Sequence, residues 1–274
     1  MPGLMELLFL LAAWAIVPLG LRFLPDAGPT RLARRLQPVA AALATVSFFV
    51  PKGPLAAGLA VPWLVLDGLL ALTALLVLKF AWRSARDVLL LAAMGFPIVG
   101  GVHLVASRLG HPLAGFPEPI VLLTAIHFHY TAFSAPILAS LAGRSRLALI
   151  SGLGIVGGTP LLAAGFLFSP ILKVVGVGVL CAAVTGLALG QLARANGLTE
   201  RRARILLTLS SLAVIAGMAL AAVYEHGFYT GRTWISIPRM AWTHGILNGV
   251  GFSLLGLLAW RPADVHRSDA PAGA

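Results

Sequence analysis

The sequence predicts an all-α, polytopic bundle of transmembrane helices, and three observations lead to this fold class. Of the 274 residues, 59% are hydrophobic and only 11% are charged, and the mean hydropathy is +0.94. About nine apolar segments follow one another, or eight if the short second one is set aside, and roughly 20 residues suffice to cross a bilayer. The connections between these segments are short, which excludes a soluble catalytic domain.

The expected spans follow the apolar runs along the chain. In chain order they cover residues 4–24, 36–50, 54–78, 88–107, 119–141, 147–168, 171–193, 205–223 and 240–260. The first carries Glu6 and no basic segment, so we expect it to remain as a span and not to be removed as a signal peptide. The chain is thus expected to form one membrane domain, residues 1–261, and a disordered cytoplasmic tail, residues 262–274.

The net charge of +11 predicts topology and not nucleic-acid binding. With nine spans the connections alternate between two sides, and 15 of the 20 Lys and Arg residues fall on one of them. Short cytoplasmic loops are rich in Lys and Arg, so the N-terminus is expected outside and the C-terminus in the cytoplasm. Membrane lipids are the expected partners of these basic residues.

Two segments leave alternatives open. Five Gly and Pro residues between positions 152 and 160 indicate either close helix packing or a short unwound turn in the sixth span, and we favour packing. The longest outer connection, residues 224–239, holds several aromatic residues. These aromatic residues predict either a belt at the membrane interface or a lid over a cavity that opens to the outer leaflet.

Polar side chains from five spans gather at one depth, in the outer half of the bilayer. Ionisable groups inside hydrocarbon are costly, so each must be paired, face a wet cavity or serve a function. Counting about 1.5 Å per helical residue places the following residues at this depth: Glu6, His103, His127, His129, Glu225, His226, His244 and Asn248. One shared site is the simplest explanation.

The fifth span has a polar stripe on one helical face. At 100° per residue, Thr124, His127, Tyr130, Thr131 and Ser134 share a face about 120° wide. Residue 129 points to the opposite side, so the two histidines of this span are expected to serve different neighbours. The proline at position 136 removes a backbone donor and is expected to kink the helix just below them.

The residue types in this group predict acid–base chemistry. His244 and Asn248 are four residues apart and stand on one helical face. Since histidine exchanges protons near neutral pH, we expect His127, His244 and Glu225 to act as general acids and bases. Residues expected to bind or position the substrate are His103, His129, Tyr130, Thr131, Asn248, Glu6 and His226. No metal site is expected.

Asp67 is considered separately because it lies near the middle of the third span. A carboxylate at this depth is costly unless it is paired or neutralised. Two interpretations remain open, a proton relay and a protonated hydrogen-bond donor to another helix.

Absent motifs narrow the functions. The chain contains no GxxxxGK[ST], HExxH, GxSxG or CxxC sequence, so ATP-driven transport, zinc proteolysis and serine hydrolysis by these routes lack support. A polar pocket in a compact bundle suits an enzyme that cyclises, isomerises or hydrates an isoprenoid or lipid-like substrate by proton transfer. The alternative is a proton-coupled small-molecule transporter, which Asp67 favours.

Two motifs carry a family resemblance. At HFHY, residues 127–130, and at THGILNGVGF, residues 243–252, the chain resembles the YndJ-like family of bacterial integral membrane proteins. The likeness runs from VPLGLRFL in the first span to the ninth span. It implies a multi-pass protein of the bacterial cytoplasmic (inner) membrane, for which transporter is a nominal label.

The HFHY motif alone is also similar to a helix of subunit I of haem and copper oxidases. In that family the two histidines are axial ligands of two haems on opposite faces, which would correspond to His127 and His129 here. The chain has no HPEVY-like stretch and no His-His pair, and it is much shorter. We therefore expect no cofactor, and haem binding is a second alternative.

Overall fold

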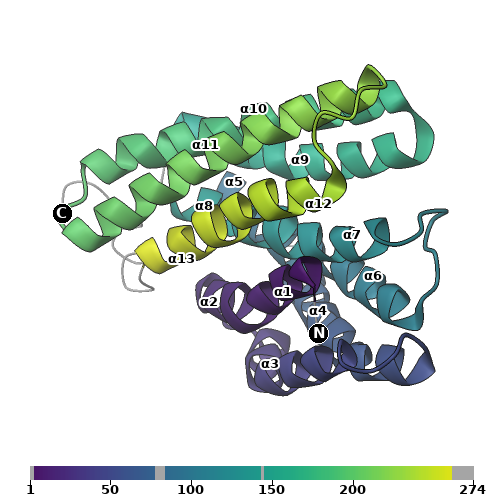
Figure 1. The fold of residues 1–274 in the computed structure, drawn as a ribbon. Coiled ribbons are helices and arrows are strands. Elements are labelled where there is room, and N and C mark those ends of the chain that lie inside the picture. The colour runs from purple at the N-terminus through teal and green to yellow at the C-terminus, as the bar shows by residue number, and fades with distance from the viewer. Residues whose placement is uncertain (1–2, 78–83, 143–144, 261–274) are drawn as a thin grey trace.

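The computed structural model describes residues 3–77, 84–142 and 145–260, which form a bundle of long helices running roughly side by side (Figure 1). Eight helical rods are long and apolar enough to cross a membrane, and α3 (Gly28–Ser47) runs beside them as a ninth. Apart from an isolated bridge between Leu113 and Phe116, the described ranges contain no β-structure. The predicted all-α membrane fold is confirmed. The tail at 262–274 lies outside the described residues.

Several rods contain more than one helical segment. The first comprises α1 (Leu4–Leu11), a π-helical turn (Ala12–Ile16), α2 (Val17–Gly20) and a 3-10 turn (Leu21–Phe23). After α3 come α4 (Pro54–Val77), α5 (Ala85–Gly95) with α6 (Pro97–Leu109), and α7 (Ile120–His129), a π-helical turn (Tyr130–Ser134) and α8 (Ala135–Leu141). The chain continues through α9 (Arg146–Phe168), α10 (Pro170–Asn196) and α11 (Arg201–Tyr229). The last rod comprises α12 (Ile237–Met240), π-helical turns at Ala241–Gly245 and Leu247–Leu254, and α13 (Leu255–Ala259).

The second span begins earlier than the sequence predicts. α3 starts at Gly28 and not at residue 36, and it ends at Ser47. Pro29 lies in its first turn, where a missing backbone donor costs little. Arg34 donates a hydrogen bond of 3.0 Å to the carbonyl oxygen of Leu21. Hydropathy misses this start because the first turns of α3 carry arginines.

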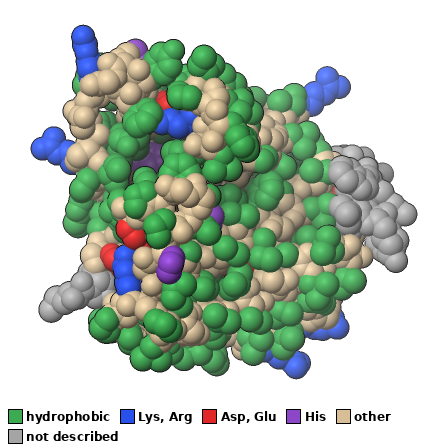
Figure 2. Space-filling model, turned by 90° about the vertical axis from the view of Figure 1, so that its right-hand side faces the viewer, with side chains coloured by type: hydrophobic (Ala, Val, Ile, Leu, Met, Phe, Trp, Pro, Cys, Tyr) green, Lys and Arg blue, Asp and Glu red, His purple; other side chains and the backbone are tan. Residues whose placement is uncertain are grey.

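The two ends of the bundle differ in charge. The first end carries Gly3 and the connections at 48–53, 110–119 and 230–236, and the second end carries those at 24–27 and 197–200. Most described Lys and Arg residues lie at the second end, as the sequence predicts. Figure 2 views the first end, where acidic and basic side chains lie next to each other in two places among hydrophobic ones. That the first end faces outside stays a prediction.

The helices divide into two groups, and the last rod lies between them. α9, α10 and α11 pack along one another, and α3, α4, α6 and α7 form a second group (Figure 1). The rod of α12 and α13 lies against α11 on one side and against the first rod on the other. Side chains from α1, the first π-helical turn, α7 and the last rod therefore meet inside the bundle.

Glycines in the sixth span serve packing. α9 is continuous from Arg146 to Phe168, and Pro160 does not break it. A Cβ atom at Gly154 would lie 2.9 Å from the Cβ of Ala183, and one at Gly152 would lie 2.9 Å from the Cβ of Ala139. The missing side chains let neighbouring helices approach, so packing is the interpretation that the structure supports.

Candidate functional site

The two histidines of α7 face different neighbours, as the helical spacing predicts. His127 lies beside His244 of the last rod, whereas His129 lies beside Asp67 and Trp63 of α4. A π-helical turn follows directly at Tyr130–Ser134, just before Pro136, so the predicted distortion below the histidines is present. The structure divides the expected shared site into separate places.

His127 and His244 form a pair of rings from two helices. Their ring centroids are 6.3 Å apart and the ring planes differ by 28°. Each residue lies seven positions from the start of its rod, at Ile120 and Ile237, which is about 10 Å from the first end. The His127 side chain is exposed and that of His244 is half-buried, so the pair borders the surface of the bundle.

The hydrogen bonds of this pair fix which ring nitrogen carries a proton. The Nδ1 atom of His127 lies 2.8 Å from the carbonyl oxygen of Leu123, and the Nδ1 atom of His244 lies 2.8 Å from that of Gly217. A carbonyl oxygen only accepts hydrogen bonds, so each Nδ1–H is the donor. Neither Nε2 atom has a protein partner among the described residues. Both Nε2 atoms are therefore available to accept or donate a proton.

Asn248 supports the helix and does not hold the imidazole. Its Nδ2 donates a 2.7 Å hydrogen bond to the backbone oxygen of His244. The ring of His244 is oriented by the carbonyl oxygen of Gly217 on α11 instead. A Cβ atom at position 217 would lie 2.6 Å from the Asn248 amide nitrogen, so the glycine lets the Asn248 side chain lie close to α11.

His129 belongs to a fully buried cluster with Asp67 and Trp63. All three side chains are inaccessible to solvent. The Trp63 indole donates a 2.9 Å hydrogen bond to Nε2 of His129, and Oδ2 of Asp67 lies 3.3 Å from the same nitrogen. Nδ1 of His129 lies 2.7 Å from the carbonyl oxygen of Ala125. Asp67 is thus the partner of a residue that we expected in a different site.

Nε2 of His129 has a single lone pair, so its contacts with the Trp63 indole and with Asp67 cannot both be conventional hydrogen bonds. Nδ1 of His129 donates to a carbonyl, and the indole of Trp63 can only donate to Nε2. Nε2 therefore acts as an acceptor, and a protonated Asp67 carboxyl would share this lone pair with the indole. If the proton moves to Nε2, the pair becomes ionic and the indole loses its acceptor. The pair holds one proton in either arrangement.

Close packing encloses the cluster. Phe9 of α1 contacts the His129 ring edge-on, with centroids 5.4 Å apart. On α6, a Cβ atom at Gly100 would lie 2.8 Å from the ring of His129, and one at Gly101 would lie 2.6 Å from Oδ2 of Asp67. Oδ1 of Asp67 is buried without a hydrogen-bond partner. The two glycines make room for the cluster.

The haem alternative gains no support from this geometry. A haem iron needs a free imidazole nitrogen, and both nitrogens of His129 are engaged. Its ring is also fully enclosed by protein. In the described ranges, no group of three or more His, Cys, Asp or Glu side chains is placed to hold a metal ion.

Tyr130, Thr131 and His103 do not join the pair formed by His127 and His244. The Tyr130 hydroxyl donates a 2.7 Å hydrogen bond to the carbonyl oxygen of Leu8 and so links α1 to the fifth span. Thr131 is half-buried in the same π-helical turn. Nδ1 of His103 bonds to the carbonyl oxygen of its own helix, at Val99.

Glu225 and His226 lie at the first end and form their own contacts. Glu225 is buried and pairs with Lys173 at 3.1 Å, and the Lys173 ammonium lies 3.3 Å from the ring centroid of Phe228. His226 is exposed and packs against Trp234, with ring centroids 5.0 Å apart. Glu225 lies eight positions from Gly217 on α11, about 12 Å along the helix. The predicted catalytic carboxylate is therefore not beside the histidine pair.

Glu6 lines a cavity of about 350 Å³ at the first end. The cavity is also lined by Lys52, Arg108, Glu118 and Trp242. The aromatic residues at 224–234 do not line it, and Phe228, Tyr229 and Trp234 are exposed. This placement favours an interfacial aromatic belt over a lid on this cavity.

The sequence analysis missed three kinds of contributor. Trp63 lies four residues before Asp67 on α4, and this i, i+4 spacing is a signal that could have found it. Gly217 orients His244 through its backbone carbonyl oxygen, and the residue type at a position does not reveal such a backbone contact. Lys52 and Arg108 were interpreted as topology signals only, and their shared cavity depends on contacts between distant segments.

Comparisons with known proteins agree with the membrane fold. A family model described as YndJ-like protein matches residues 7–252. A Bacillus subtilis (strain 168) protein named "Uncharacterized membrane protein YndJ" is 29% identical over 281 residues, which cover 97% of this chain and 50% of that protein. The chain thus spans about half the length of this curated relative. No solved structure matches.

Proposed function

Since this chain belongs to the YndJ-like family and is an integral membrane protein, we propose that it catalyses acid–base chemistry on an isoprenoid or lipid-like molecule dissolved in the membrane. Its place would be the bacterial cytoplasmic membrane, with the first end outside. The family resemblance predicted from residues 127–130 and 243–252 is confirmed. The activity itself is argued from the site.

The observation that supports this proposal best is the pair of His127 and His244. The rings come from different helices, lie at the same depth and each leave Nε2 without a protein partner. An exposed imidazole inside a membrane span is costly unless water or a substrate contacts it. Since the His127 side chain is exposed, a membrane-dissolved substrate would reach the pair at the surface of the bundle.

The pair would act as one acid and one base. At a centroid separation of 6.3 Å, two positively charged imidazoles would repel each other, so the pair holds at most one extra proton, and the singly protonated pair is the form that would react. The neutral Nε2 removes a proton from one substrate carbon, and the protonated Nε2 delivers a proton to another. The net result is an isomerisation or a cyclisation without gain or loss of protons. Hydration would add one water molecule as a second substrate.

The test is a comparison of membrane-extractable molecules. Cells that make the parental chain, His127→Gln or His244→Gln would be extracted with organic solvent and analysed by mass spectrometry. We expect a product in the parental cells that both variants lose, while the exposed His226→Gln control keeps it. If both folded variants retained the product, the proposal would be wrong.

A second candidate function, proton-coupled transport of a small molecule, is favoured by the cluster of Asp67, His129 and Trp63. A carboxyl and an imidazole lie 3.3 Å apart in the interior of the bundle, where they could share one proton. Buried ionisable pairs of this kind are common in proton relays. Asp67→Asn would then abolish uptake driven by a proton gradient in vesicles, whereas the enzyme would keep its turnover without a gradient.

A further inference from the structure

The cavity at the first end collects opposite charges from distant parts of the chain. Its volume is about 350 Å³, which lies within the range of small-ligand sites. The lining comes from α1, α6, the two connections beside them, the start of α7 and the last rod. The residues are Gly3, Leu4, Met5, Glu6, Lys52, Arg108, Glu118, Pro119, Leu122, Pro238, Ala241 and Trp242.

Two of its four charged side chains satisfy each other. Glu118 accepts a hydrogen bond from Lys52 at 3.1 Å and another from the hydroxyl of Ser107. Its second carboxylate oxygen accepts from the backbone N–H of Leu122 at 3.3 Å. Glu118 is therefore fully engaged and fixes one wall of the cavity.

The other two charged side chains, Arg108 and Glu6, form no direct ion pair in the described part of the chain, although Glu6 and Glu118 attract the Arg108 charge at longer range. Arg108 is only 5% exposed and donates a single hydrogen bond, from Nη2 to the carbonyl oxygen of Val50 at 3.0 Å. Its Nε is buried without an acceptor, and its Nη1 has no partner within the described residues. The Glu6 carboxylate likewise forms no hydrogen bond or ion pair with the described part of the chain. The guanidinium of Arg108 and the carboxylate of Glu6 thus line the same cavity, and each can form further hydrogen bonds with a ligand.

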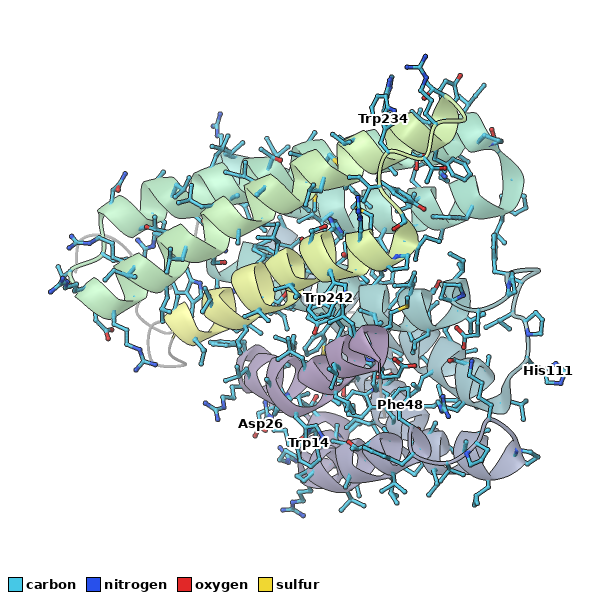
Figure 3. All side chains as sticks on the ribbon, viewed as in Figure 1. Trp14, Asp26, Phe48, His111, Trp234 and Trp242 are labelled. Atoms are coloured by element: carbon cyan, nitrogen blue, oxygen red, sulfur yellow. The ribbon has the colours of Figure 1, made fainter. Side chains whose placement is uncertain are left out.

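The remaining lining is apolar. Trp242 is 61% exposed, and Met5 and Leu122 add aliphatic surface. In Figure 3, Trp242 of the last rod and Phe48, whose ring lies 4.9 Å from the Arg108 guanidinium carbon, lie on either side of α1. The cavity therefore combines a charged part with a wall that suits hydrocarbon.

The charge balance selects the class of ligand. Lys52 and Arg108 balance Glu6 and Glu118, so the cavity is neutral overall. A ligand with one anionic and one cationic group would satisfy Arg108 and Glu6 together, whereas a simple anion would leave Glu6 opposed to it.

We propose that this cavity binds a zwitterion that has a phosphate and a primary ammonium group, as in the headgroup of an ethanolamine phospholipid. The phosphate bonds to Arg108, the ammonium bonds to Glu6, and the glycerol and first acyl carbons pack on Trp242. The same chemistry is present in water-soluble glycerophosphoethanolamine. This site is independent of the function proposed for His127 and His244.

The test measures lipid binding to the delipidated full-length protein in detergent by native mass spectrometry. Three probes are titrated: dioleoyl phosphatidylethanolamine, dioleoyl phosphatidylglycerol, which lacks the ammonium, and glycerophosphoethanolamine. We expect the ethanolamine lipid to bind about tenfold more tightly than the glycerol lipid, since one charged hydrogen bond is worth about this factor.

Two variants test whether Glu6 binds the ammonium group and Arg108 binds the phosphate group. Glu6→Gln should bring the two lipid affinities to a similar value, and Arg108→Gln should weaken both by about tenfold. Arg232→Gln, an exposed substitution at the same end, serves as the matched control and should change neither. If Arg108→Gln does not fold, Glu6→Gln still tests the proposal. This variant is expected to fold, because Glu6 forms no hydrogen bond with the described residues that the substitution would remove.

Two outcomes would overturn the proposal: equal binding of both lipids by the parental protein, or an unchanged preference in Glu6→Gln. The soluble probe identifies the source of the zwitterion. Displacement of the lipid only at large excess supports a lipid headgroup, and displacement at matching concentration supports a soluble zwitterion bound by the same residues.

Discussion

His127 and His129 lie two residues apart on α7 and have opposite surroundings. The ring of His127 is exposed, and only its Nδ1 is bonded to protein. The ring of His129 is fully buried, and both of its nitrogens are bonded. One helix therefore presents a histidine that can react and a histidine that is held by its neighbours.

The difference shows that depth in the membrane does not by itself identify a functional group. Both residues lie about 10–14 Å from the first end. What separates them is the direction in which they point, because it decides whether the neighbour is a second open imidazole or the buried pair of Asp67 and Trp63. The reactive role is assigned to the ring with a free nitrogen.

The largest expected effect is on turnover through His127 and His244. Either substitution by Gln should lower turnover by about a hundredfold or more, since general acids and bases contribute roughly 10²–10⁴-fold. The double variant should be little worse than either single variant, because residues that act as a unit are not additive. Product formation per folded protein measures this. Independent, additive losses would contradict a paired role.

Removal of one partner from the buried cluster should have the next largest effect, on stability. His129→Ala should lower the free energy of unfolding by about 3–5 kcal/mol, because Asp67 and the Trp63 indole are left buried without a partner. Asp67→Ala should cost less, because His129 keeps its contacts with Ala125 and Trp63. Thermal unfolding in detergent measures this loss.

Asp67→Asn tests whether the Asp67 carboxyl is protonated in the folded protein. An amide resembles a protonated carboxyl, so the cost should fall to about 1 kcal/mol if the pair holds a single proton. A loss as large as that of His129→Ala would argue for a charged carboxylate in the folded protein.

Gly100→Ala tests the enclosure of His129. The new Cβ would lie 2.8 Å from the ring, and such overpacking should cost about 1–3 kcal/mol. Gly178→Ala in α10 is the matched control, because no atom lies within 4 Å of its Cβ position. The control should be neutral or slightly stabilising. Similar unfolding temperatures for the two variants would show that the cluster is loosely packed.

Trp63→Phe is also expected to have a small effect. This variant keeps an aromatic ring against Phe9 and removes only the indole donor to His129, at a cost of about 1–2 kcal/mol. Trp14→Phe removes a comparable 2.9 Å hydrogen bond to Thr45 at an exposed position and should cost less. An equal loss of unfolding free energy in both variants would indicate that the buried hydrogen bond stabilises the fold no more than the exposed one.

Residue spacing predicted much of the fold and the opposed directions of His127 and His129. The spans follow from apolar runs. Two residues that are two positions apart on a helix point in directions about 200° apart, whatever surrounds the helix. The start of α3 was not predictable from hydropathy, because its arginines act through contacts with the end of the first rod.

The division of the polar residues could not be predicted in the same way. Counting from span ends gives the height of Glu225, His244 and Asp67 but not their direction or which helices are neighbours. Lys173 of α10 forms an ion pair with Glu225, and Asp67 of α4 lies next to His129. These pairings depend on helix arrangement, which a single sequence does not contain.

The central claim is that His127 and His244 have open ring nitrogens while His129 is closed, and carbethoxylation by diethyl pyrocarbonate tests it most directly. The reagent modifies unprotonated, accessible imidazole nitrogens, and peptide mass spectrometry locates each modified residue. We expect His127 and His244 to react in the folded protein and His129 to react only after unfolding. Reaction of His129 as fast as His127, or protection of both His127 and His244, would contradict the claim.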